Sequence, residues 1–379
     1  MQFFTDDLIA DPYPHYQRWR DDQPIWWEES SGQWVLTRNE DVQRVLRDHD
    51  CFSSAAMGAG NSPLPLLTDD PPRHTKLRGI VNKAFTTRML RDLEPAIEEV
   101  ARDLVGRFPD GELDVVEALT VPFPVIVISR MMGIPEERRE DFKRWSDALT
   151  GILAGTSLED RRSEILEMAT FFQTLIPERR LTPGDDLLSA VARAEVDGQY
   201  LSDAEIVGFN MLLLIAGNET TTNLLGNMLN VLATRPDVWM ELRNNPDLIE
   251  PAIEETFRFD SPVQFLMRQA TEEVEFHNQP VKQGERVMVV MGSANRDSRV
   301  IDSPDEFDIG RDKTRHYSLG YGIHFCLGAP LARLEARIAM GVLLERFDLL
   351  DPGLVAGKRV PSHLLRGFER LPLRFNRAR

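Results

Sequence analysis

Residues 318–333 read Ser318-Leu-Gly-Tyr-Gly-Ile-His-Phe-Cys-Leu-Gly-Ala-Pro-Leu-Ala-Arg333, and this stretch decides the fold and the chemistry. Three glycines surround Cys326, and an expected helix, Pro330–Phe347, follows directly. Glycine lets a backbone approach a flat ligand closely and adopts positive φ. Because helix N-termini favour anions, we expect a lowered pKa for this thiol. A buried structural cysteine in a tight turn is the alternative interpretation, which the glycine spacing disfavours.

The spacing Gly320-x-Gly-x-His324-x-Cys326-x-Gly328 resembles the haem-binding loop of the cytochrome P-450 family. The resemblance implies that Cys326 is the axial thiolate ligand of iron in haem b, and that Leu319, Gly320, His324 and Gly328 contact the haem. A thiolate ligand pushes electron density towards dioxygen and favours O–O cleavage. The family usually has Phe where this chain has Leu319; leucine keeps the apolar shielding and loses the ring.

Glu255 and Arg258 lie three residues apart, on one face of an expected helix, where they can form an ion pair. An exposed pair of this kind is worth about 0–1 kcal/mol. The resemblance implies instead a buried structural pair that Arg311 locks. Loss of one partner of a buried pair costs about 3–5 kcal/mol.

The segment Ala216-Gly-Asn-Glu-Thr-Thr221 lies in the apolar centre of a long expected helix, which a capping box at Ser202 and Glu205 begins. A glycine, a glutamate and a run of threonines are poor choices there, and such violations are typical of functional sites. The resemblance implies that Ala216 and Gly217 border the haem and that the glycine opens a groove for dioxygen. It also implies that Thr220 hydrogen-bonds the oxygen and that Glu219 relays protons. The alternative is a polar patch where the helix leaves the core.

Haem propionates need cationic partners, because burying carboxylates unpaired is costly. The resemblance implies this role for four residues: His74, Arg78, Arg268 and His324. For any one of them alone, an exposed charge is the ordinary interpretation.

The resemblance places the substrate pocket along Ser54–Leu67, within Phe142–Phe172, on the long helix and around position 264. The residues expected to line it are Leu67, Leu212, Ile215, Val263, Gln264 and Phe265. This lining predicts a lipophilic small-molecule substrate, with Gln264 as a polar handle. Ordinary core packing explains the apolar residues equally well.

Most of the chain has the three- and four-residue apolar spacing of helices. Besides the two helices above, we expect Asn39–Arg47, Leu90–Arg107, Pro135–Leu153, Ser163–Leu175 and Pro246–Arg258. Short strands are expected at Trp34–Thr37, Glu273–Phe276 and Arg286–Met291. The pattern predicts a mainly α protein with a small β region. The resemblance extends from Asp11-Pro-Tyr-Pro14 through Gly292-Ser-Ala-Asn-Arg-Asp297 to the C-terminal helix, and it implies the P-450 fold with haem between the long helix and the cysteine loop (Ser318–Gly328).

The net charge of −17 argues against a nucleic-acid partner and against docking on an anionic membrane. The apolar runs are far shorter than the roughly 20 residues that span a bilayer. The only two cysteines, Cys51 and Cys326, are too few for an iron–sulfur cluster or a structural zinc site. With no linker or repeat, residues 1–379 are expected to form one domain, in a monomeric cytoplasmic protein.

No flavin or nicotinamide fingerprint is present, so electrons must come from another protein, for which we expect a small acidic ferredoxin and its reductase. Arg73–Arg91 contains six cations and no acid, and Arg333 and Arg337 follow the cysteine loop. A basic face of this kind steers an acidic donor, although simple solvation explains the charges equally well.

Three functions remain: an O2-dependent monooxygenase, a peroxide-driven peroxygenase and a haem-thiolate sensor or binding protein. The intact Glu219–Thr220 pair ranks the peroxygenase lower, because peroxygenases of the family tend to lack it. The absence of a second output domain disfavours the sensor.

Overall fold

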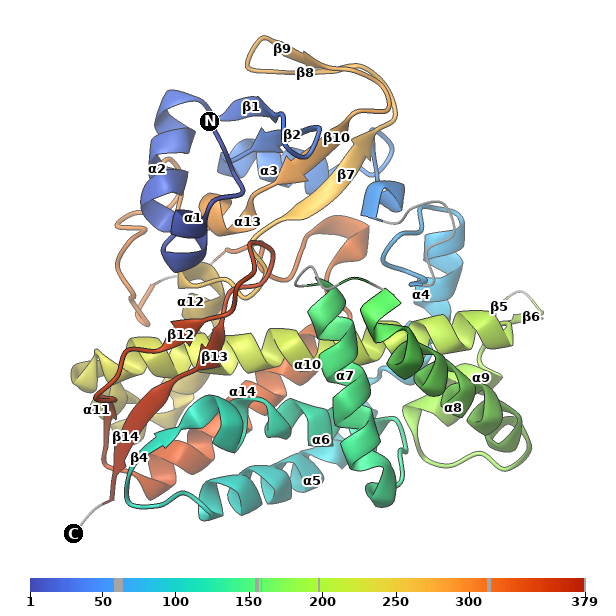
Figure 1. The fold of residues 1–379 in the computed structure, drawn as a ribbon, viewed down its shortest axis with the longest axis vertical. Helices are drawn as coiled ribbons and strands as arrows, with labels where there is room; N and C mark the ends of the chain where they lie inside the picture. Colours follow the sequence, from blue (N-terminus) through green and yellow to red (C-terminus); the bar gives the residue numbers. More distant parts are fainter. Residues whose placement is uncertain (58–63, 154–156, 158, 197, 312–314, 378–379) are drawn as a thin grey trace.

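A central helix organises the molecule. The computed structural model describes residues 1–57, 64–153, 157, 159–196, 198–311 and 315–377. Helix α10 (Asp203–Ala233) crosses its middle, with α1–α3 and the main sheet on one side and α5, α6 and α14 on the other (Figure 1). The expected capping box is present: the Ser202 hydroxyl accepts from the Glu205 N–H at 3.3 Å, and the Ser202 N–H donates to the Glu205 carboxylate at 2.9 Å.

The described part has further α-helices, of which α6, α8, α14 and α7 pack against α10. They are α1 (Asp6–Ala10), α2 (Tyr13–Asp22), α3 (Asn39–Arg47), α4 (Arg73–Ala84), α5 (Thr87–Gly106), α6 (Pro122–Met131), α7 (Arg139–Leu153), α8 (Arg162–Leu181), α9 (Leu187–Arg193), α11 (Pro236–Asn244), α12 (Ile249–Phe259), α13 (Met291–Ala294) and α14 (Ala329–Arg346). Short 3-10 or π turns are η1 (Ser54–Met57), η2 (Val116–Thr120), η3 (Glu136–Arg138), η4 (Glu159–Arg161), η5 (Pro246–Leu248) and η6 (Gly322–His324). None of the described helices combines the length and the apolar character needed to span a membrane.

The main sheet has five strands in the order β1-β2-β10-β7-β3. They are β1 (Ile25–Glu28), β2 (Gln33–Leu36), β10 (Arg286–Val289), β7 (Leu266–Ala270) and β3 (Phe52–Ser53). Strands β2 and β10 are parallel, the other neighbours are antiparallel, and Arg268 of β7 lies opposite Val287 of β10. This pairing fixes the strand from which Arg268 projects.

The remaining strands form one three-stranded sheet and three small hairpin-like pairs. They are β4 (Gly111–Asp114), β11 (Leu349–Pro352) and β14 (Pro372–Asn376), then β12 (Lys358–Arg359) with β13 (Phe368–Arg370), β5 (Glu195–Val196) with β6 (Gln199–Tyr200), and β8 (Val274–Phe276) with β9 (Gln279–Val281).

The expected helices and strands are present, but several of them begin or end at residues other than those expected. The expected helix Asn39–Arg47 is observed with those bounds, whereas Pro246–Arg258 divides into η5 and α12. The expected strand Arg286–Met291 ends at Val289, because Met291 begins α13. Strand β7 was not expected, and it is the strand that carries Arg268.

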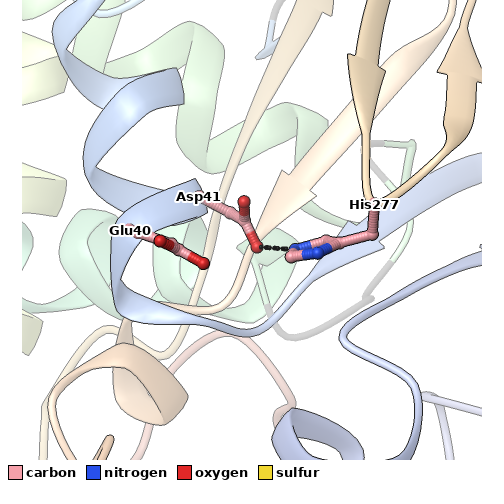
Figure 2. A group of neighbouring side chains, drawn as sticks. All are labelled: Glu40, Asp41 and His277. Atoms are coloured by element: carbon pink, nitrogen blue, oxygen red, sulfur yellow. Dashed lines mark hydrogen bonds and ion pairs between the residues drawn. The ribbon is translucent and has the colours of Figure 1, made fainter. Parts of the chain in front are cut away.

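Side chains of α3 hold the β8–β9 hairpin, and Arg44 of α3 donates to the Glu275 carbonyl at 3.1 Å. His277 occupies the hairpin turn with φ +49°, and its Nε2 lies 2.7 Å from the Asp41 carboxylate (Figure 2). Glu40 points towards the same place (Figure 2), and one polar atom from each of the three side chains lies within 4.8 Å of the other two. The His277–Asp41 contact joins the hairpin turn to α3 together with Arg44, and we assign it a structural role.

Candidate active site

The cysteine loop is held by its own backbone. The Cys326 N–H donates to the Leu319 carbonyl at 2.8 Å, and Leu319 itself is buried. Gly320 has φ +73°, and a Cβ there would lie 3.3 Å from the His324 carbonyl oxygen. Gly322 has φ +72°, and a Cβ there would lie 2.8 Å from the carbonyl oxygen of Leu46 in α3. Both glycines are therefore required by backbone conformation and by close packing.

Cys326 is half-buried and stands three residues before the first residue of α14. Burial raises the pKa of its thiol, and the N–H groups of Gly328 and Ala329 and the charge of Arg78 lower it less than burial raises it. The N–H groups at the helix N-terminus lower this pKa as expected, but the net pKa is raised, because desolvation outweighs them. A cation bound to the sulfur would reverse this balance, because a metal favours the deprotonated thiol.

The structure brings the four expected propionate ligands together, and we call them the basic cluster (His74, Arg78, Arg268 and His324). The rings of His74 and His324 have centroids 4.2 Å apart. Burial, together with the charges of Arg268, His74 and Arg78, lowers the pKa of His324 to about 3. Burial also lowers the pKa of Arg268 to about 10.

One member of the basic cluster supplies a test of whether haem fits. His74 is buried, and within the described residues neither of its ring nitrogens has a hydrogen-bond partner. Buried polar atoms normally have partners, so this imidazole fits a carboxylate acceptor beside it. Arg78 has a second role, because it donates to the Phe325 carbonyl at 2.7 Å and so also holds the cysteine loop. The chemistry of the cluster matches two haem propionates.

The central turn of α10 has one accessible face. Ala216 is exposed in the middle of this otherwise buried helix, and Leu212, Ile215, Glu219 and Thr220 are half-exposed. These positions recur at three- and four-residue spacing, so they share a face. Such a face in the centre of a protein is suited to a bound cofactor and substrate.

Two contacts define the packing of this turn. A Cβ on Gly217 would lie 3.2 Å from Cδ1 of Ile128 in α6, so the glycine lets α6 pack closely against α10. The helix continues through the segment as expected, and the Thr220 hydroxyl donates to the Ala216 carbonyl at 2.6 Å. This bond satisfies the hydroxyl inside the helix, and its oxygen can still accept a hydrogen bond.

Glu255, Arg258 and Arg311 meet in the interior. The Arg258 guanidinium donates to both Glu255 oxygens at 2.8 and 2.6 Å, and Arg311 donates to Glu255 at 3.4 Å. Arg258 also donates to the carbonyls of Asn295, Pro304 and Glu306, which belong to the segment leading towards the cysteine loop. The pair joins α12 to that segment, which is the arrangement that the resemblance implies.

Two residues expected in the pocket lie elsewhere. The Gln264 side chain is engaged at both ends: its oxygen accepts from the Tyr16 hydroxyl at 3.0 Å and its nitrogen donates to the Ser261 carbonyl at 2.6 Å. The ring of Phe265 packs against that of Phe3, with centroids 5.5 Å apart. Both side chains are bound by the N-terminal region, so neither is a polar handle or a pocket wall. Leu67 and Val263 are half-buried; residues 58–63, 154–156 and 158 of the expected pocket segments lie outside the described residues.

The sequence did not single out Glu335, a buried carboxyl on α14. Burial raises its pKa to about 8, and the Thr221 hydroxyl of α10 lowers it only partly. Within the described residues neither carboxyl oxygen accepts a hydrogen bond of normal geometry, so the Thr221 contact is a weak one. A glutamate in the apolar stripe of the last helix was the signal that could have revealed it.

Replacing Glu335 by Gln is expected to flatten the pH dependence of stability. The raised pKa means that the folded state holds a proton between about pH 4.5, the ordinary glutamate value, and about pH 8. Stability therefore falls as pH rises through this window. At pH 9 we expect Glu335→Gln to be more stable than the wild type by about 2–5 kcal/mol, and at pH 4.5 to equal it.

Urea unfolding followed by fluorescence at several pH values measures this difference. Glu345→Gln is the matched control, since Glu345 lies on the same helix but is exposed, and its pH profile should follow that of the wild type. Parallel profiles for Glu335→Gln and the wild type would contradict the buried neutral carboxyl.

The fold and this site are those of a haem-binding protein, with the basic cluster beside the cysteine loop. A family model described as cytochrome P450 matches residues 124–364. The chain is 41% identical over 352 residues to putative cytochrome P450 YjiB of Bacillus subtilis, covering 90% of this chain and 88% of that one. It is 39% identical over 342 residues to erythromycin C-12 hydroxylase of Saccharopolyspora erythraea, covering 87% and 86%.

Solved structures agree with the sequence relatives. CYP109E1 from Bacillus megaterium in complex with testosterone is similar with a TM-score of 0.89 and 38% identity, over 97% of this chain and 99% of that one. The chain belongs to the cytochrome P450 family. It is therefore a haem b enzyme of the monooxygenase class, an oxidoreductase, with the mainly α P450 fold.

Proposed function

We propose that the enzyme inserts one oxygen atom from O2 into a lipophilic small molecule, and that the Cys326 thiolate would hold the haem iron. The observation that carries the proposal is the convergence of the basic cluster on the cysteine loop, where Arg78 joins the two by its bond to the Phe325 carbonyl. The bound haem supplies the redox centre at which dioxygen is activated. We place the protein in the cytoplasm, where reducing conditions keep the Cys326 thiol free for this role.

The accessible face of α10 supplies the other groups. Glu219 holds a carboxylate and Thr220 a hydroxyl on the same half-exposed face as Ala216, so a proton can be held there and passed inward. Leu212 and Ile215 on this face offer apolar contact to the substrate. One relative is named as an erythromycin C-12 hydroxylase, and another was solved in complex with testosterone. These two names support a substrate of macrolide or steroid size.

A small acidic ferredoxin with its reductase is the proposed electron donor. The expected basic face supports this less strongly than its composition suggests, because four of its cations are paired with acids. These pairs are Arg73 with Glu205, Arg88 with Asp92, Arg333 with Glu254 and Arg337 with Glu94. The steering of the ferredoxin towards this surface therefore depends on the summed electrostatic field of all its charges, and only a few individual cations contribute by themselves.

The experiment supplies haem-loaded protein with NADH, ferredoxin reductase and a [2Fe–2S] ferredoxin, and uses testosterone as the first probe. We expect one atom of isotopically labelled O2 in the product. Thr220→Ala is expected to keep NADH consumption but to lower product per NADH by about tenfold or more, because a positioned proton donor typically contributes at least that much.

Thr234→Ala is the control, since Thr234 caps the far end of the same helix and its hydroxyl donates to the Val231 carbonyl. Equal coupling in Thr220→Ala and the wild type would count against the proton relay. Efficient turnover with hydrogen peroxide and no donor would favour the peroxygenase, and reduced protein that consumes no oxygen with any probe would favour the sensor.

A further inference from the structure

A buried polar contact joins two helices in an apolar region. Asn218 of α10 and Ser146 of α7 are both buried, and the Asn218 amide nitrogen donates to the Ser146 hydroxyl at 2.5 Å. They are 72 residues apart in sequence. Burying an amide is costly unless it is hydrogen-bonded, so this asparagine is tied to the partner that satisfies it.

The orientation of Asn218 is also fixed. The Thr222 hydroxyl lies one turn further along α10, 3.4 Å from the Asn218 amide oxygen. The same hydroxyl donates to the Thr120 carbonyl in η2 at 2.7 Å. Thr222 therefore stands on the oxygen side of the amide, which leaves the nitrogen directed at α7.

Asn218 stands at a distinctive place on α10. Its neighbour Gly217 faces Ile128 of α6, and its other neighbour, Glu219, lies on the accessible face. Ile215, an expected pocket residue, is three positions before Asn218 and hence adjacent to it on the helix surface. A shift of α7 at Ser146 would therefore alter the space beside Ile215.

Helix α7 belongs to a layer that packs on α10. It contacts α6, α8 and α10, and its buried Trp145 lies against Phe171 of α8 with ring centroids 5.2 Å apart. Apolar contacts of this kind tolerate small shifts, whereas a buried hydrogen bond is directional and specifies one arrangement.

We propose that the Asn218–Ser146 hydrogen bond positions α7 beside the ligand pocket, so that Asn218 is a positioning residue for bulky ligands. The inference rests on the proposed function in one respect: the ligands that test it bind at the proposed haem site. Removing the bond leaves α7 freer to move away from α10. A bulky ligand then leaves more easily, while a small ligand that does not reach α7 is unaffected.

The first measurement is hydrogen exchange of α7 peptides in haem-loaded protein, read by mass spectrometry. Asn218→Leu and Ser146→Ala should each exchange faster in α7 than the wild type does. Asn210→Leu is the matched control: Asn210 is equally buried in α10, but its amide donates within the helix to the Ile206 carbonyl at 2.7 Å. The control should leave exchange in α7 unchanged.

The second measurement is the optical shift produced when imidazole or 4-phenylimidazole binds the haem iron. We expect Asn218→Leu and Ser146→Ala each to raise the Kd of 4-phenylimidazole about fivefold, the scale of one buried hydrogen bond, and to leave the Kd of imidazole unchanged. The double variant should match either single variant, because both remove the same bond.

Two results overturn the proposal. The first is that α7 exchanges hydrogen in both single variants at the wild-type rate. The second is that the double variant changes the Kd of 4-phenylimidazole by the sum of the two single effects, in free-energy terms. If Asn218→Leu folds poorly, Ser146→Ala, which removes one buried oxygen, decides the matter alone. If no azole produces a shift in the wild type, the haem-thiolate assignment fails, and the exchange rates of α7 still decide the role of the hydrogen bond.

Discussion

Cys326→Ala protein is expected to lose the strongly red-shifted band of the reduced carbon-monoxide complex completely. This band requires a thiolate opposite the carbon monoxide, and alanine has no ligand atom. The other cysteine cannot take over, because the Cys51 thiol donates to the Glu272 carboxylate at 3.1 Å on the β3–β7 side of the main sheet. That contact, with burial, also raises the pKa of the Cys51 thiol to about 12.

Difference spectra of dithionite-reduced protein with and without carbon monoxide measure the effect, and the haem content is determined in parallel. Cys51→Ala is the matched control, and it should keep the full band. The thiolate assignment of Cys326 is wrong if its alanine variant retains the band, and equally if Cys51→Ala loses it.

Features encoded within a few residues of sequence could be predicted. The capping box at Ser202 and the bounds of α3 depend on contacts within one or two turns. The Glu255–Arg258 pair is also local, since a separation of three residues places both on one helix face. The glycines of the cysteine loop follow the same rule, because glycine adopts positive φ at little cost whatever surrounds it.

Features that depend on distant packing could not be predicted. The direction of Gln264 is set by Tyr16, and that of Phe265 by Phe3, both from the N-terminal region. The net pKa of Cys326 depends on how deeply the folded chain buries the sulfur. No local pattern could indicate these outcomes, because each is decided by which segments lie side by side in the fold.

The same limit applies to buried polar groups. Glu335 and Asn218 each look like an ordinary helix residue until the structure shows which helix faces them. Glu335 of α14 then proves to contact the central turn of α10, and Asn218 in that turn proves to contact α7. The single polar residues within apolar helices were the only signal available beforehand.

Glu255→Ala is expected to yield little haem-loaded protein. The Glu255 and Arg258 side chains are 1% and 0% exposed, so the variant leaves an uncompensated guanidinium in the interior. Loss of one partner of such a pair costs about 3–5 kcal/mol, a large part of the stability of a typical protein. The damage also reaches the haem site, because Glu255 accepts from the Asp308 N–H at 3.0 Å and from Arg311, both on the segment leading to the cysteine loop.

The ratio of haem absorbance to protein absorbance after purification measures this loss, together with urea unfolding of whatever protein remains soluble. Glu254→Ala is the matched control: Glu254 is the preceding residue, also bonded to an arginine, but its side chain is 30% exposed. Removing it should cost less than removing Glu255, because water partly screens a half-buried pair. Normal haem occupancy in Glu255→Ala would refute the structural role of the pair. The buried Arg258 guanidinium, once it has lost its carboxylate, is expected to displace the cysteine loop.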